Sequence, residues 1–124
     1  MTRIRTYRDL NVFVLSFELA KKIFEISKQF PQEEKYSLTD QMRRSSRSVS
    51  ANIAEAFSAR RYPKSFVSKL IIAECEAAET QTWLDFSLAF NYIEKQVHHA
   101  LHREYSQVIA MLVNMTNNPE KWVI

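Results

Sequence analysis

The residues best suited to metal or acid–base chemistry lie in the segment IEKQVHHALHREY, where Glu94, His98 and His102 are spaced four residues apart. On a helix this spacing places the three side chains on one flank, and two imidazoles four residues apart can share a divalent cation. A di-metal centre of the four-helix type also needs Glu-x-x-His motifs on two helices, and the sequence contains none. We therefore expect surface histidines that pair with Glu94 or solvent, and we expect no metal or other cofactor.

Two glutamates and one cysteine upstream of the histidines are further candidates for reactive chemistry. Glu76 and Glu79 are close in the sequence, but they suit Arg44 or Lys69 as ion-pair partners better than they suit each other as an acid–base pair. Cys75 has no histidine nearby and is expected to be an inert, packed thiol. No catalytic residue is predicted, and the protein is not expected to be an enzyme.

Basic side chains are concentrated in one stretch of the chain. Residues 43–69 contain seven basic residues and one acidic residue, Glu55, which gives this stretch a net charge of +6 in a chain whose total is +3. Such a cluster can neutralise phosphates, although no motif for reading bases accompanies it. The alternatives are a solvated helix face or a docking face for another protein. The candidate nucleic-acid-binding residues are Arg43, Arg47, Arg60, Arg61, Lys64 and Lys69, with Arg3, Arg5 and Arg8 as a second small cluster.

The elements that must position these residues are predicted to be helices. The 124 residues include no glycine and only three prolines, so the chain lacks the usual residues of tight hairpins. Prolines and capping residues divide the chain into helices at about 10–29, 38–60, 64–91 and 93–117, with Asp9 capping the first helix and Ser37 and Asp40 forming a capping box for the second. Short connections favour antiparallel neighbours. The predicted fold is all-α: an antiparallel up-down-up-down four-helix bundle over residues 9–124, preceded by a basic N-terminal arm at residues 1–8.

The cellular compartment follows from what the sequence contains. The N-terminal segment MTRIRTYRDLNVFVLSFELA has polar interruptions and no small-residue cleavage site, so no signal peptide is expected. No apolar run reaches the roughly 20 residues that span a bilayer, and we expect no membrane partner. A single cysteine cannot form an intrachain disulfide. A cytoplasmic protein is predicted.

The apolar spacing predicts packing seams and a further interface. In the second helix a narrow stripe of small and apolar residues should face the core, and Arg43, Arg47 and Arg61 fall within about 40° of one another opposite it. The third helix is apolar on two sides, which one bundle cannot bury, so a homo-oligomer is predicted, with a compact monomer of wide core as the alternative. The predicted interface residues are Arg44, Ser48, Asn52, Glu55, Ile72, Trp83, Phe86 and Phe90, and the core stripes are Leu38, Met42, Ser45, Val49, Ile53 and Ala56 and Phe66, Leu70, Ala73, Ala77, Leu84 and Leu88.

Four segments carry a resemblance to a known family: RDL and FP at the two ends of the first predicted helix, YSLTDQMRRSSRSVSANIAEA, and AECEAAE. Over nearly its whole length the chain is similar to the bacterial four-helix bundle proteins called 23S rRNA intervening-sequence proteins. The resemblance implies an antiparallel four-helix bundle that assembles as a homopentamer around a central channel, with nucleic acid (RNA or DNA) as the suggested ligand. It also implies a more distant similarity to accessory proteins of the reverse transcriptases of diversity-generating retroelements, which makes a reverse transcriptase a possible protein partner. Two functions are therefore carried forward: nucleic-acid binding without base-specific readout, and an oligomeric scaffold or adapter for another protein.

Overall fold

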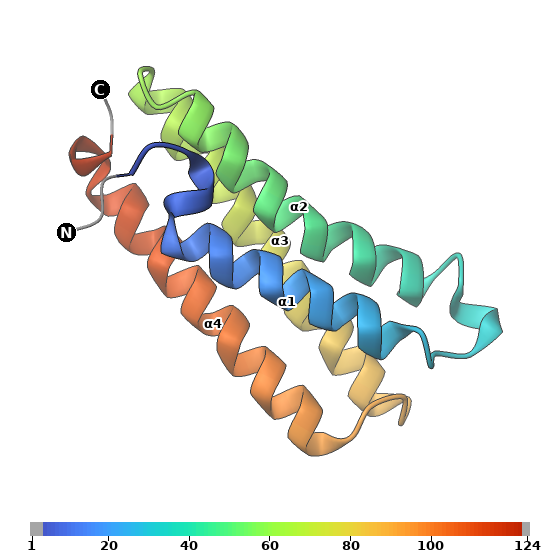
Figure 1. Cartoon of the computed structure of the whole chain (residues 1–124). Helices are drawn as coiled ribbons and strands as arrows, with labels where there is room; N and C mark the ends of the chain where they lie inside the picture. Colours follow the sequence, from blue (N-terminus) through green and yellow to red (C-terminus); the bar gives the residue numbers. More distant parts are fainter. Residues whose placement is uncertain (1–3, 123–124) are drawn as a thin grey trace.

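The computed structural model describes residues 4–122, and these residues form four α-helices and no strand. Three short 3-10 turns adjoin the helix ends, and Figure 1 shows η1 and η3 toward the same end of the molecule as the α2–α3 turn. No helix in this range combines the length and apolar character needed to cross a membrane. All four predicted helices are present, each within two residues of its expected bounds: α1 (Asn11–Ser27), α2 (Leu38–Ser58), α3 (Pro63–Ala89) and α4 (Lys95–Asn117), with η1 (Tyr7–Asp9), η2 (Gln32–Glu34) and η3 (Pro119–Lys121).

The start of α1 differs from the prediction. Asp9 does not cap this helix but closes η1, where its Oδ2 accepts hydrogen bonds from the backbone N–H groups of Arg5 at 2.8 Å and Thr6 at 3.0 Å. These bonds lower the pKa of the Asp9 carboxyl because they stabilise its charged form, and the bond from Thr6 has the larger effect. Leu10 then precedes α1 without a side-chain cap.

The capping box predicted for α2 is also wrong. Ser37 occupies the cap position, but its side chain makes no cap hydrogen bond. The turn η2 instead brings Glu34 over the start of the helix, where its Oε1 accepts the N–H of Leu38 at 3.3 Å. Tyr92 Oη donates to the other oxygen of Glu34 at 2.9 Å, and this bond lowers the pKa of the Glu34 carboxyl. One carboxylate thus caps α2 and ties the α1–α2 connection to the α3–α4 connection.

An asparagine performs the sharp turn after α3 in this glycine-free chain. Asn91 has φ 63°, the left-handed conformation that asparagine tolerates better than most residues. Its N–H bonds to the carbonyl of Leu88, and the N–H of Tyr92 bonds to that of Ser87 at 2.8 Å, which satisfies the last carbonyls of the helix. For this reason α3 ends at Ala89 rather than at residue 91, and α4 begins at Lys95 rather than at residue 93.

The four helices enclose one apolar core, in which α1 and α3 each pack against both α2 and α4. The predicted stripe of α2 is buried throughout, and that of α3 is buried except for the half-buried Leu88. On α1 the core face is formed by Val12, Leu19 and Ile23. The large aromatic residues of α1, Phe17 and Phe24, point away from the core and remain 49% and 36% exposed.

Buried hydroxyl pairs lie where α2 packs against its neighbours. Ser50 of α2 lies 2.9 Å from Ser16 of α1 (Oγ to Oγ), and Ser45 of α2 lies 2.8 Å from Thr80 of α3 (Oγ to Oγ1). All four side chains are buried. Small residues let helix backbones approach closely, and pairing the hydroxyls avoids the cost of unsatisfied polar groups.

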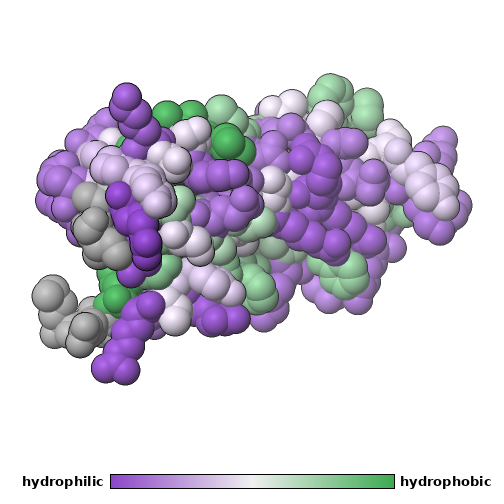
Figure 2. Space-filling model, turned by 90° about the horizontal axis from the view of Figure 1, so that it is seen from above, coloured by the Kyte–Doolittle hydropathy of each residue, from purple (hydrophilic) through white to green (hydrophobic). Residues whose placement is uncertain are grey.

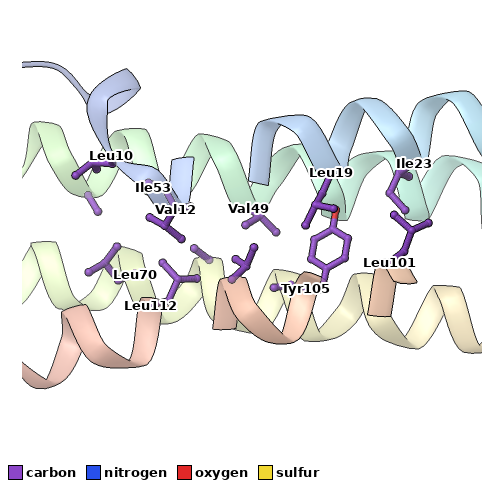
Figure 3. Packing of buried hydrophobic residues seen from close by; sticks show 14 of the residues in the cluster. Leu10, Val12, Leu19, Ile23, Val49, Ile53, Leu70, Leu101, Tyr105 and Leu112 are labelled. Carbon is purple, nitrogen blue, oxygen red and sulfur yellow. The ribbon is translucent and has the colours of Figure 1, made fainter. Parts of the chain in front are cut away.

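Tyr105 of α4, by contrast, has a buried hydroxyl that is not paired with any residue the structure describes. Its ring is fully buried and reaches toward Leu19 of α1 (Figure 3), and its hydroxyl has no hydrogen-bond partner among residues 4–122. Burial strongly raises the pKa of this phenol. We expect Tyr105→Phe to raise the free energy of unfolding by about 1 kcal/mol, since it removes a buried unpaired hydroxyl at nearly constant volume.

Urea unfolding followed by circular dichroism measures this change. Tyr92→Phe is the matched control, because Tyr92 donates a hydrogen bond to Glu34 and its loss should lower the stability. If Tyr105→Phe destabilised the protein as much as Tyr92→Phe, the Tyr105 hydroxyl would have to be making a favourable interaction.

Candidate nucleic-acid interface

The six basic residues predicted to bind nucleic acid do not form one patch. Arg43 and Arg47 lie on the side of α2 that faces α1, and Arg60, Arg61 and Lys64 surround the α2–α3 turn. Lys69 belongs to α3, and its Nζ contacts Glu55 Oε1 of α2 at 3.1 Å. The ion pair compensates the charge of Lys69, so five of the six remain without an acidic partner among residues 4–122.

The side chains of Arg43 and Arg47 are gathered around one aromatic ring of α1. The guanidinium carbon of Arg43 lies 4.6 Å from the ring centroid of Phe24, and that of Arg47 lies 5.8 Å from it. Arg43 Nε donates a hydrogen bond of 2.8 Å to Ser27 Oγ, which fixes the orientation of its planar group. Lys28 Nζ approaches the same ring at 4.8 Å. Three cations therefore border one exposed phenylalanine.

The second basic group is at the end of the bundle that contains the α2–α3 turn. Arg60 packs its guanidinium over the ring of Phe57 at 3.8 Å and donates to the Phe57 carbonyl at 3.0 Å. Arg61 and Lys64 are exposed, with no ion pair within the described part of the chain. Arg8 of η1 lies toward the same end (Figure 1). Arg3, which belongs to the predicted N-terminal arm, lies outside the described residues.

Among the predicted interface residues of α2, Arg44 contacts α3 of the same chain. Arg44 Nη1 contacts Glu76 Oε2 at 2.9 Å, and its Nη2 donates to Glu79 Oε2. The prediction that these glutamates pair with Arg44 is therefore confirmed, and the contact with Glu76 is the main reason that the pKa of Arg44 is raised. Asn52 is almost buried and donates to the backbone and hydroxyl oxygens of Ser48.

The aromatic residues predicted for the interface extend along α3 from this cluster. Trp83 Nε1 donates to Glu79 Oε2 at 3.1 Å, and its ring is 5.9 Å from that of Phe86, which is in turn 5.7 Å from Phe90. Phe86, Phe90 and Ile72 are exposed, whereas Trp83 is half-buried. The structure thus leaves an apolar strip on α3 next to the Arg44 ion pairs.

The histidine cluster does not form as its spacing suggests. Glu94 is in an extended conformation just before α4, so it leaves the flank on which His98 and His102 lie. His98 Nε2 instead lies 2.7 Å from Asp85 Oδ1 of α3. Within residues 4–122 no three potential ligands come close enough to hold a metal ion. Cys75 is exposed, which corrects the prediction of a packed thiol.

A broad hollow of about 870 Å³ lies across the outer side of α1, flanked by α2 and α4. In Figure 2, which views the molecule of Figure 1 from above, the surface is mainly hydrophilic with small separate hydrophobic patches. Sequence reasoning did not connect the exposed aromatic residues of α1 with the arginines of α2. The hollow is lined by Phe17, Glu18, Ala20, Lys21, Lys22, Phe24, Glu25 and Ile26 of α1, Arg47 and Ser50 of α2, and Val97, Ala100, Leu101 and Glu104 of α4.

Comparison with known proteins gives a consistent result. The family model described as 23S rRNA-intervening sequence protein matches residues 8–114. No curated protein matches the chain. A crystal structure of a protein of unknown function from the S23 ribosomal protein family of Bacteroides thetaiotaomicron is 30% identical in sequence and superposes with a TM-score of 0.78, covering 86% of this chain and 96% of that one. The chain therefore belongs to the 23S rRNA-intervening sequence protein family.

Proposed function

We propose that this protein is a non-enzymatic, homo-oligomeric helical bundle that binds RNA or DNA through its basic surfaces without reading the base sequence. The observation that carries the proposal is that Arg43, Arg47, Arg60, Arg61 and Lys64 have no acidic partner among the described residues. Uncompensated, clustered cations attract phosphates and release their counterions. The rRNA context in the family's name supports the same ligand class.

The proposed assembly is a homopentamer of antiparallel up-down-up-down bundles. The exposed apolar residues Ile72 and Phe86 on α3 and Phe90 directly after it support self-association, because exposed apolar patches commonly mark contact sites. Repetition of the basic groups around a ring would multiply weak phosphate contacts into useful affinity. The mass in solution, measured by light scattering, tests the assembly separately from nucleic-acid binding.

A second candidate function is that of a scaffold or adapter for another protein, such as a reverse transcriptase. The same strip of Phe86 and Phe90 favours it, because these rings are 44% and 50% exposed and contain no charge to attract phosphate. In that case the strip would take the partner, and generic nucleic acid would not bind.

Fluorescence anisotropy with generic RNA and DNA tests the first proposal. We expect binding at about 50 mM salt that weakens steeply toward about 200 mM, since each neutralised phosphate adds to the salt dependence. Arg47→Glu and Lys64→Glu should each weaken binding about tenfold. Lys35→Glu is the control, because it makes the same change of charge next to η2, outside the basic groups and at the other end of α2 from Lys64. Binding unchanged by salt and by both substitutions would exclude these residues as the site.

A further inference from the structure

We infer that the hollow across α1 binds single-stranded nucleic acid, with bases stacking on Phe17 and Phe24 and with phosphates held by Arg43 and Arg47. The inference rests on the proposed nucleic-acid binding and gives it a strand preference and a location. Stacking on aromatic side chains inside a positively charged groove is the general physical basis of binding single strands without sequence preference.

The exposed rings of α1 can stack with the bases of a flexible single strand but not with those of a duplex. Phe17 and Phe24 are 49% and 36% exposed, seven residues apart and therefore on one side of the helix. Phe17 continues a row of rings, since its centroid is 5.7 Å from that of Phe13 and the two ring planes are inclined by 29°. Bases in a duplex are stacked on one another, so only unpaired bases can reach such rings.

The charge around the hollow selects a polyanion. Two lysines on α1 and Lys28 directly after it are already paired with glutamates at 3.3–3.5 Å: Lys21 with Glu18, Lys22 with Glu104 and Lys28 with Glu25. Arg47 lines the hollow and Arg43 lies at its edge beside Phe24, and neither has such a partner in the described range. The unpaired positive charges at this site are therefore those of Arg43 and Arg47. Both stand beside Phe24, which would bring a phosphate and the base attached to it within reach of one cluster.

The lining of the hollow matches this ligand. Ala20, Val97, Ala100 and Leu101 provide small apolar walls next to Phe17 and Phe24. A volume of about 870 Å³ is in the range of sites that enclose organic ligands. An acidic amphipathic helix would satisfy the arginines as well, since a guanidinium binds carboxylates and phosphates alike. The exposed rings of Phe17 and Phe24 favour a strand with planar bases that can stack on them.

The test compares a labelled single-stranded oligonucleotide with its own duplex, using the full-length protein and anisotropy at low salt. We expect the wild type to bind the single strand more tightly. Phe17→Leu combined with Phe24→Leu keeps the apolar surface but removes the rings, and it should weaken single-strand binding at least tenfold while duplex binding changes less than twofold. Phe90→Leu is the control, because Phe90 is also exposed but follows the end of α3 and does not line the hollow.

The outcomes separate this inference from the general proposal. If the strands bind equally well and the double variant loses neither, the hollow is not the site, although nucleic-acid binding stands. If neither strand binds at low salt, both proposals fail. If the double variant loses an acidic protein ligand but binds single strands as before, the hollow is a protein-docking site and the inference is overturned. Far-ultraviolet circular dichroism of each variant verifies that the fold is retained.

Discussion

Replacing Ser45 with leucine should lower the free energy of unfolding by about 3 kcal/mol. Ser45 is fully buried between α2 and α3, and its hydroxyl is 2.8 Å from that of Thr80. Leucine would add three carbon atoms where no space exists, and overpacking of a dense core typically costs about 1–3 kcal/mol. The expected loss of stability is at the upper end of this range because the substitution also removes a buried hydroxyl pair. Urea unfolding monitored by circular dichroism would measure the change in free energy. A thermal melt of the same variant should show a fall in midpoint temperature of about 10 °C.

Ser68→Leu is the matched control for this prediction. Ser68 lies on α3 and is exposed, so the same substitution there should change the stability by less than about 0.5 kcal/mol. Equal stability of the two variants would mean that α2 and α3 do not approach one another closely at Ser45. The seam of small residues would then have no structural role.

The helices and the core stripe of α2 could be predicted from the sequence because they depend on local signals. Prolines end helices through steric limits on their neighbours, and a repeat of apolar residues at helical spacing identifies the buried side. The absence of glycine correctly excluded hairpins. The left-handed conformation that Asn91 takes after α3 was not predicted from the sequence. Asparagine is the usual replacement for glycine at this position of a helix end.

The grouping of the basic residues could not be predicted from one helical wheel. Arg61 was placed beside Arg43 and Arg47 on the assumption that the second helix continued to residue 60, but α2 ends at Ser58, so the direction of Arg61 no longer follows the helical repeat. Lys69 belongs to another helix, and only the packing of α3 on α2 brings it to Glu55. Contacts between helices depend on tertiary arrangement, which spacing along a single helix does not contain.

The surroundings of the histidine pair and of the cysteine also could not be predicted from spacing along a single helix. Glu94 was assigned to the flank of His98, yet it lies one residue before α4 in an extended conformation, and Asp85 of α3 takes its place. Cys75 lies between two apolar sides of α3, but only one of these sides faces the core, so the thiol is exposed. In each case the residue types were noted correctly and the partner was decided by a neighbouring element.

Replacing Arg44 with methionine should lower the free energy of unfolding by about 2 kcal/mol. Its guanidinium bridges Glu76 and Glu79 of α3 and also donates to Gln41 Oε1 at 3.2 Å. Exposed ion pairs contribute little, and the Arg44 side chain is 47% exposed. Glu76, however, is only 16% exposed, so methionine would leave a mostly buried carboxylate without a counterion, next to a second negative charge.

Two further variants test whether Arg44 stabilises the protein in this way. Lys21→Met breaks the exposed pair with Glu18 and should cost less than about 0.5 kcal/mol. Adding Glu76→Gln to Arg44→Met should recover part of the loss, because it removes the stranded charge. If Arg44 acts within one chain, as its contacts with α3 indicate, the loss will be the same at every protein concentration. A loss that grows on dilution would instead show that Arg44 stabilises a contact between subunits, as its place among the predicted interface residues suggested, since only association depends on concentration.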